Sequence, residues 1–172
     1  MDQTELLISD LLNSGSFLSI WYWIFLAVVW AQMTHFTIGI GHHDVRQAAR
    51  AGGQFMTDLE KLVDINLRNN LWVLRKYGAL VVGFMAFFFA VFITTGFVFG
   101  FELMQAIAIF WFFVCLLGMI SWRFLTRLEV EQPKGKELTK HFSRHTTLKQ
   151  IIGFSSLLIT AFYGVWHAAA GG

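Results

Sequence analysis

The chain has 172 residues, of which 56% are hydrophobic and only 14% charged, a composition far more apolar than that of ordinary soluble domains. At this length residues 1–172 form a single domain, and the lone cysteine, Cys115, excludes a disulfide framework. All 13 Lys and Arg residues fall within residues 46–76 and 123–149, so membrane topology explains the basic balance without nucleic-acid binding.

The first apolar run, residues 17–40, is long enough to cross a bilayer core of about 30 Å as a helix. It follows an acidic tail and lacks the basic start of a signal peptide, which predicts a helix that is retained. Ala27, Ala31, His35 and Gly39 recur every four residues and therefore share one face of this helix. Because small residues allow close approach of helices in membranes, we expect this face to pack against another helix.

Residues 41–76 form the longest segment between two apolar runs. Its apolar residues follow a helical period: Met56, Leu59, Leu62, Val63, Leu67, Leu71 and Leu74. This pattern predicts an amphipathic helix after a break at Gly52-Gly53. Such a helix can lie at the cytoplasmic headgroups or dock on a partner subunit. Since its acids and bases nearly cancel, attraction to anionic lipid is weak and a protein partner is favoured.

Residues 77–101 and 103–122 are the second and third apolar runs, broken only by Gly100-Phe101-Glu102. One helix over both runs would be about twice too long for a bilayer, which predicts a tight hairpin. Gly96 and Gly100 provide a small face at the outer end of the second run, where we expect helix packing. Glu102 marks the turn in the interface, or forms a charged ring in a homo-oligomeric pore.

The fourth apolar run, residues 151–170, follows a second basic segment, residues 123–150, in which Pro133 indicates a surface turn. Ser156, Thr160, Gly164 and Ala168 recur every four residues, which predicts a second packing face. The predicted fold class is therefore an all-α membrane protein with four transmembrane helices, an amphipathic cytoplasmic helix between the first two, and no soluble domain.

The charge distribution predicts the orientation of the chain, because basic residues are kept on the cytoplasmic side of a membrane. The segments 41–76 and 123–150 hold all 13 basic and seven acidic residues, a formal charge of +6. The remaining tails and turn hold four acidic residues and no basic one. We therefore expect both basic segments inside and both termini outside, which is N-out/C-out with four crossings.

Six histidines are the candidates for metal or haem chemistry. His141 and His145 would share one face of a helix, and His42-His43 could complete a metal site, but the neighbouring bases would repel a cation. His35 and His167 lie toward opposite ends of their spans, so they are at different depths and do not form the axial pair of one haem. No metal, haem or other cofactor is expected.

The stretch Trp21-Tyr22-Trp23, the segment from Trp30 to Gly39 and the following Arg46, Arg50 and Gly52-Gly53 together carry a resemblance. This first third of the chain resembles a group of small, uncharacterised multi-pass inner-membrane proteins of alphaproteobacteria. The resemblance implies a location in a bacterial cytoplasmic membrane and assigns no reaction, ligand or functional residue.

Two observations bear on function. The cores of the spans contain no Asp, Glu, Lys or Arg, which disfavours a proton-coupled carrier, and the sequence has no motif that indicates an enzyme. Small-residue faces and aromatic-rich surfaces favour binding over turnover. We therefore expect a non-catalytic accessory, assembly or scaffold subunit that contacts membrane lipids and other integral membrane proteins, for example in a respiratory or photosynthetic complex. The alternative is a homo-oligomeric ion channel or transporter component, and a metal- or haem-binding redox protein is a third reading.

Overall fold

Five α-helices and a short hairpin make up the part of the chain that the computed structural model describes, residues 20–37 and 39–169. They are α2 (Ile20–His35), β1 (Phe36–Thr37), β2 (Ile40–Gly41), α3 (His42–Ala51), α4 (Gly53–Ile93), the π-helical turn η2 (Thr94–Val98), α5 (Glu102–Glu131) and α6 (Gly135–Ala169). The predicted all-α class is confirmed. Three helices, α4 with η2, α5 and α6, are long and apolar enough to cross a membrane, whereas α2 is shorter.

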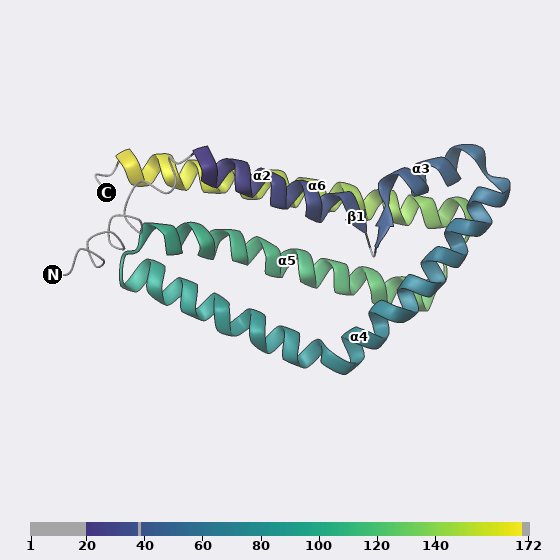
Figure 1. Cartoon of the computed structure of the whole chain (residues 1–172), viewed down its shortest axis with the longest axis horizontal. Coiled ribbons are helices and arrows are strands. Elements are labelled where there is room, and N and C mark those ends of the chain that lie inside the picture. Colours follow the sequence, from purple (N-terminus) through teal and green to yellow (C-terminus); the bar gives the residue numbers. More distant parts are fainter. Residues whose placement is uncertain (1–19, 38, 170–172) are drawn as a thin grey trace.

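The helices form two antiparallel pairs that lie side by side (Figure 1). Helix α4 pairs with α5, and α2 pairs with α6. The start of α2, the η2 turn and the end of α6 gather at one end of the molecule, and α3, the first half of α4 and the turn between α5 and α6 lie at the other. In between, α4 bends where its amphipathic half meets its apolar half.

The first apolar run is helical over a shorter stretch than predicted. Helix α2 ends at His35, and β1 (Phe36–Thr37) then pairs with β2 (Ile40–Gly41) as an antiparallel hairpin. Gly39 adopts a φ of +76°, a left-handed conformation that glycine accepts without strain and that lets the chain reverse. The prediction of one helix over residues 17–40 is therefore wrong at its C-terminal end, because the reversal brings Ile40 into a buried core, where it is 1% exposed.

The predicted boundaries between inner segments and spans are not helix boundaries. The predicted break at Gly52-Gly53 is present, but α4 then continues from the amphipathic segment through the second apolar run. Helix α5 extends past residue 122 to Glu131, and α6 begins at Gly135. Only residues 132–134, which include Pro133, interrupt the second basic segment, so its turn lies where the sequence predicts it.

The inner ends of these helices surround a core of their own. Its buried members are Ile40, Val45, Ala48, Leu59, Val63, Phe124, Leu128, Leu138 and Phe142. The rings of Phe124 and Phe142 pack edge to face with centroids 5.3 Å apart. Burying such side chains contributes about 1.5–3 kcal/mol each, so the apolar face of the first half of α4 is stabilised within the chain itself. We call this cluster the inner core.

A second cluster joins α2 to α5 and α6 through Leu26, Trp30, Phe113 and Leu117. Gly153 of α6 makes room for the indole of Trp30, since a Cβ at that position would lie 3.1 Å from Cε3 of the ring. Because Gly153 has no side chain, α2 can approach α6 closely, as helices do at small residues in membrane bundles.

Polar contacts add to the apolar packing at the end of the bundle away from the inner core. Nε2 of Gln105 donates a hydrogen bond to the Gly96 carbonyl at 2.9 Å, and the Tyr163 hydroxyl donates to Oε1 of Gln105 at 3.1 Å. Gln105 thus ties η2 to α6. Nearer the middle, Nε1 of Trp111 donates to the Met85 carbonyl at 3.1 Å and fixes α5 against α4.

Candidate interaction grooves at the inner end

The amphipathic half of α4 exposes apolar residues on the face that does not enter the inner core. Phe55, Leu62, Ile65 and Trp72 have exposed fractions between 38% and 56%. At 3.6 residues per turn they fall within one sector of about 100°. All four precede the predicted span 77–101, so on that prediction they lie outside the bilayer interior, where an exposed apolar surface indicates an interaction site. We call these four residues the α4 strip.

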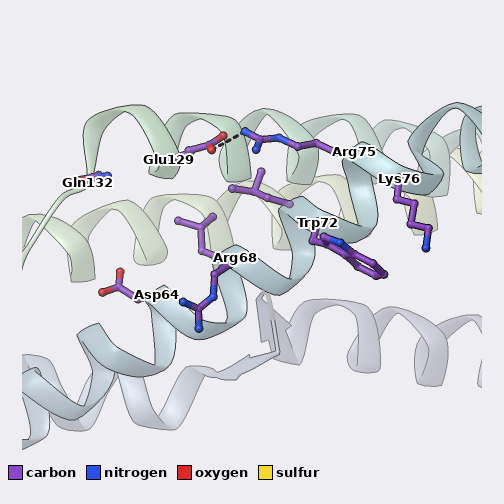
Figure 2. A pocket seen from close by; sticks show the side chains of 9 residues that line it. Asp64, Arg68, Trp72, Arg75, Lys76, Glu129 and Gln132 are labelled. Atoms are coloured by element: carbon purple, nitrogen blue, oxygen red, sulfur yellow. Dashed lines mark hydrogen bonds and ion pairs between the residues drawn. The ribbon is translucent and has the colours of Figure 1, made fainter.

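Beside the strip lies an open groove of about 590 Å³ between α4 and α5, the α4/α5 groove (Figure 2). It is lined by Asp64, Leu67, Arg68, Leu71, Trp72, Arg75, Lys76, Glu129 and Gln132. Figure 2 shows Arg75 reaching across to Glu129, and its Nη2 lies 2.6 Å from the carboxylate. Lys76 Nζ lies 4.8 Å from the centroid of the Trp72 ring.

The charges of the α4/α5 groove largely cancel. Its lining has three basic and two acidic residues, a formal charge of +1. Arg75 is paired with Glu129, and Lys76 lies over an aromatic face. The groove therefore presents mixed charges next to apolar surface, which resembles the rim of a protein interface more than an anion site.

A second groove, of about 450 Å³, lies between α5 and α6 on the inner side of the predicted spans. This α5/α6 groove is lined by Ile120, Arg123, Phe124, Arg127, Glu137, Lys140, His141, Arg144, His145 and Leu148. Four bases face one acid, a formal charge of +3 with the histidines neutral. Of the ion pairs between residues that the structure describes, none includes Arg123, Arg127, Lys140 or Arg144. The two grooves thus differ in charge.

His145 lies at the base of the α5/α6 groove and is only 4% exposed. Its ring stacks on Phe124 with centroids 4.0 Å apart and an interplanar angle of 24°. Neither ring nitrogen has a hydrogen-bond partner within the described part of the chain. Burial, and to a lesser degree the nearby positive charge of Lys149, lower the pKa of His145 to about 4, so the imidazole is neutral at neutral pH.

The two histidines of the candidate metal pair contact different side chains. His141 and His145 both line the α5/α6 groove, but Nε2 of His141 faces a Glu131 carboxylate oxygen at 3.6 Å, whereas His145 lies against Phe124. His43 lies on the surface beside Asp44, with 3.7 Å between Nδ1 and Oδ1. Over residues 20–37 and 39–169 no group of three or more His, Cys, Asp or Glu side chains is placed to hold a metal ion.

Three of the six candidate histidines have side chains that the structure does not describe. The side chains of His35, His42 and His167 are outside the described part of the chain.

Glu102, the candidate for a charged ring, begins α5 and is partly exposed. A carboxylate at that position interacts favourably with the positive end of the helix dipole.

The predicted packing face of α6 lies inside the bundle. Ser156 and Thr160 are 0% exposed and Gly164 is buried, while the side chain of Ala168 is outside the described part. Gly96 is also buried and lies in close contact with α5, whereas Gly100 is exposed and turns the chain at a φ of +77°.

The predicted packing face of α2 is exposed, unlike that of α6. Leu26 and Trp30 form the side of α2 that is buried against α5 and α6. Ala27, Ala31 and Gly39 are exposed on this chain. The small-residue face of α2 is therefore on the outside of the four-helix arrangement.

No family model, curated protein or solved structure matches this chain in the three comparisons. The sequence predicts only a basic segment with a surface turn over residues 123–150, so the α5/α6 groove was not predicted. The signal was present: Arg123 and Arg127 are four residues apart, as are Lys140 and Arg144, so each pair shares one face of a helix.

Proposed function

We propose that this chain is a non-catalytic accessory, assembly or scaffold subunit of a bacterial cytoplasmic membrane that packs against other integral membrane proteins. In this proposal the chain crosses the membrane four times with both termini outside. The grooves and the inner core then lie at the cytoplasmic side, and the surfaces that bind partners are the apolar faces left open by the bundle.

The proposed orientation is supported by the position of the charges in the fold. All 13 basic residues belong to segments at the end of the molecule that holds α3 and the inner core (Figure 1). Helix α2 has 16 residues, or about 24 Å at 1.5 Å per residue, and lies along α6. In this proposal α2 supplies the fourth crossing.

The observation that carries the proposal is the α4 strip. Its four large apolar side chains are exposed although they precede the predicted span, and the groove beside them is nearly neutral. A near-neutral helix gains little from anionic headgroups, so a protein surface is the partner that its chemistry fits best.

Two features of the predicted spans support the same conclusion. Only 6% of the most apolar window of α4 is buried within the chain, compared with 28% in α5 and in α6. The exposed Ala27 and Ala31 on α2 offer a surface that another helix could approach closely. The membrane part of the chain thus leaves open both an aromatic helix face and a small-residue face.

The test is the native mass of the chain after mild extraction from the membranes in which it is made. We expect the wild-type chain to migrate in an assembly with other integral membrane proteins. The double variant Leu62→Asn and Ile65→Asn should release it from that assembly, because polar side chains are then placed in the contact. Val130→Asn is the matched control, since Val130 is 83% exposed on α5 and lies outside the α4 strip.

Two results would overturn the proposal. If the wild-type chain migrates alone, at the mass of its 19.7 kDa polypeptide with bound detergent, there is no partner subunit. If it migrates as a closed ring of identical chains, the homo-oligomeric alternative replaces the proposal. Ion flux through vesicles containing Glu102→Gln would then be the next measurement.

A further inference from the structure

The α5/α6 groove lies at the level where headgroups would meet the chain. Ile120 falls inside the predicted span 103–122, and Leu148 comes just before the predicted span 151–170. The groove continues from these apolar residues into the basic pairs on α5 and α6. Trp122, at the end of the span, is 41% exposed, and tryptophan prefers the membrane interface.

Among the residues that the structure describes, no ion pair includes any of the four bases of this groove. Arg123 and Arg127 come from α5, and Lys140 and Arg144 come from α6, so two helices present positive charge to one cavity. Glu137 is the only acid in the lining. Holding four like charges together costs free energy by mutual repulsion, which a bound anion would offset.

His145 supplies an independent indication of a ligand. It is a polar side chain with 4% exposure that lines the groove, and its ring nitrogens have no hydrogen-bond partner among the described residues. A neutral imidazole has one N–H donor, and leaving a buried donor without a hydrogen bond costs free energy. Both ring nitrogens are covered in this structure, so a phosphate oxygen at the groove would accept that hydrogen bond after a side-chain shift that uncovers one of them.

We propose that the α5/α6 groove binds the phosphate headgroup of an anionic phospholipid, held by Arg123, Arg127, Lys140 and Arg144. The apolar end formed by Ile120 and Leu148 receives the start of the acyl chains. Basic pockets between transmembrane helices on the cytoplasmic side bind such headgroups in general. This inference does not depend on the proposed partner of α4, because the two grooves lie on opposite sides of α5 and share no lining residue.

The first experiment uses the purified full-length chain in a mild detergent. Phosphatidylglycerol, phosphatidylcholine and inorganic phosphate are each titrated while the thermal unfolding midpoint is followed, and retained lipid is counted by native mass spectrometry. We expect phosphatidylglycerol to raise the midpoint and to be retained, and phosphatidylcholine to do neither. Equal effects of the two lipids would overturn the proposal. Saturation by inorganic phosphate alone would also overturn it, because the ligand would then be a free anion.

The second experiment removes the charges. Because each base near an anionic surface adds roughly fivefold to affinity, Arg127→Ala with Arg144→Ala should weaken phosphatidylglycerol binding about 25-fold at low salt. Arg127→Lys with Arg144→Lys should retain most of the binding. The matched control is Arg50→Ala with Lys61→Ala, which removes the same charge from exposed positions outside the groove. An equal loss in the control would show that only net charge matters and would overturn the site.

A third variant keeps the test decisive if the double alanine variant does not fold. Glu137→Gln removes the only acid of the groove without removing a base. We expect phosphatidylglycerol to bind about fivefold more tightly to this variant at low salt. Unchanged affinity would overturn the assignment of the headgroup to this groove.

Discussion

Gly96 and Gln105 meet so closely that position 96 has no room for a side chain. A Cβ on Gly96 would lie 2.7 Å from the backbone nitrogen of Gln105, and Gln105 Nε2 donates to the Gly96 carbonyl at 2.9 Å. Gly96 belongs to the π-helical turn η2, and Gln105 lies in the first turn of α5. This contact therefore closes the hairpin that the two adjacent apolar runs require.

We expect Gly96→Ala to destabilise the chain by about 1–3 kcal/mol, because the added methyl would meet backbone atoms that cannot move aside. Gly83→Ala is the control: Gly83 lies in α4, and a Cβ there has no atom within 4 Å. Replacing a helical glycine by alanine at such a site is expected to be neutral or to stabilise by up to about 1 kcal/mol. Thermal or denaturant unfolding in detergent measures both. Equal stability of the two variants would contradict the close contact.

The hydrogen bonds of Gln105 predict an energetic coupling between η2, α5 and α6. Gln105→Leu removes the bonds to Gly96 and Tyr163, and Tyr163→Phe removes only the second. Hydrogen bonds between membrane helices contribute about 0.6 kcal/mol on average and up to about 1.7 kcal/mol. In a double-mutant cycle we expect the two losses to sum to more than the loss in the double variant. Strict additivity would mean that the Tyr163 hydroxyl does not stabilise the bundle through Gln105.

Periodicity and charge in the sequence were sufficient for the helical class, the hairpin near Glu102 and the buried face of α6 at Ser156 and Thr160. These features depend on local patterns: long apolar runs, a short polar break and a four-residue spacing of small residues. The early end of α2 was not predictable in this way, because Phe36 to Gly41 are as apolar as the helix before them. What ends the helix is the burial of Ile40 in a core formed by residues distant in the sequence.

The two grooves also depend on contacts between residues that are distant in the sequence. The inner core joins Leu59 and Val63 of α4 to Phe124 and Phe142 of the next two helices, and this packing holds segments together that are distant in the sequence. Hydropathy predicts that charged residues lie outside the membrane, but it does not predict whether they are helical. Hydropathy therefore places the bases of the α5/α6 groove in a basic segment outside the spans but does not predict that two helices bring them together.

Trp30 is predicted to be the main anchor of α2. It is 4% exposed and packs over Gly153 of α6, and its ring meets Phe110 edge to face with centroids 6.1 Å apart. Trp30→Ala should destabilise the chain by about 3–5 kcal/mol, as for other buried aromatic residues. Trp166→Ala is the matched control, because Trp166 is 58% exposed on α6. Unfolding midpoints in detergent compare the two, and similar small losses would show that α2 is held by other contacts.

The buried imidazole of His145 predicts that stability falls with acidification. Its folded pKa of about 4 is below the ordinary value of 6.5, so between these values the unfolded chain binds a proton that the folded chain does not. The contribution of the neutral ring is therefore fully present above pH 6.5, decreases as the pH falls toward about 4, and changes no further below it.

His145→Phe isolates this contribution, because phenylalanine keeps a flat ring against Phe124 but has no group that titrates. The other ionisable groups are common to both proteins, so the difference in stability between the two is the quantity to measure. We expect the variant to gain stability relative to the wild type as the pH is lowered from 6.5, in unfolding curves recorded at successive pH values. A difference that does not change with pH would mean that His145 can be protonated in place, with the groove open to water.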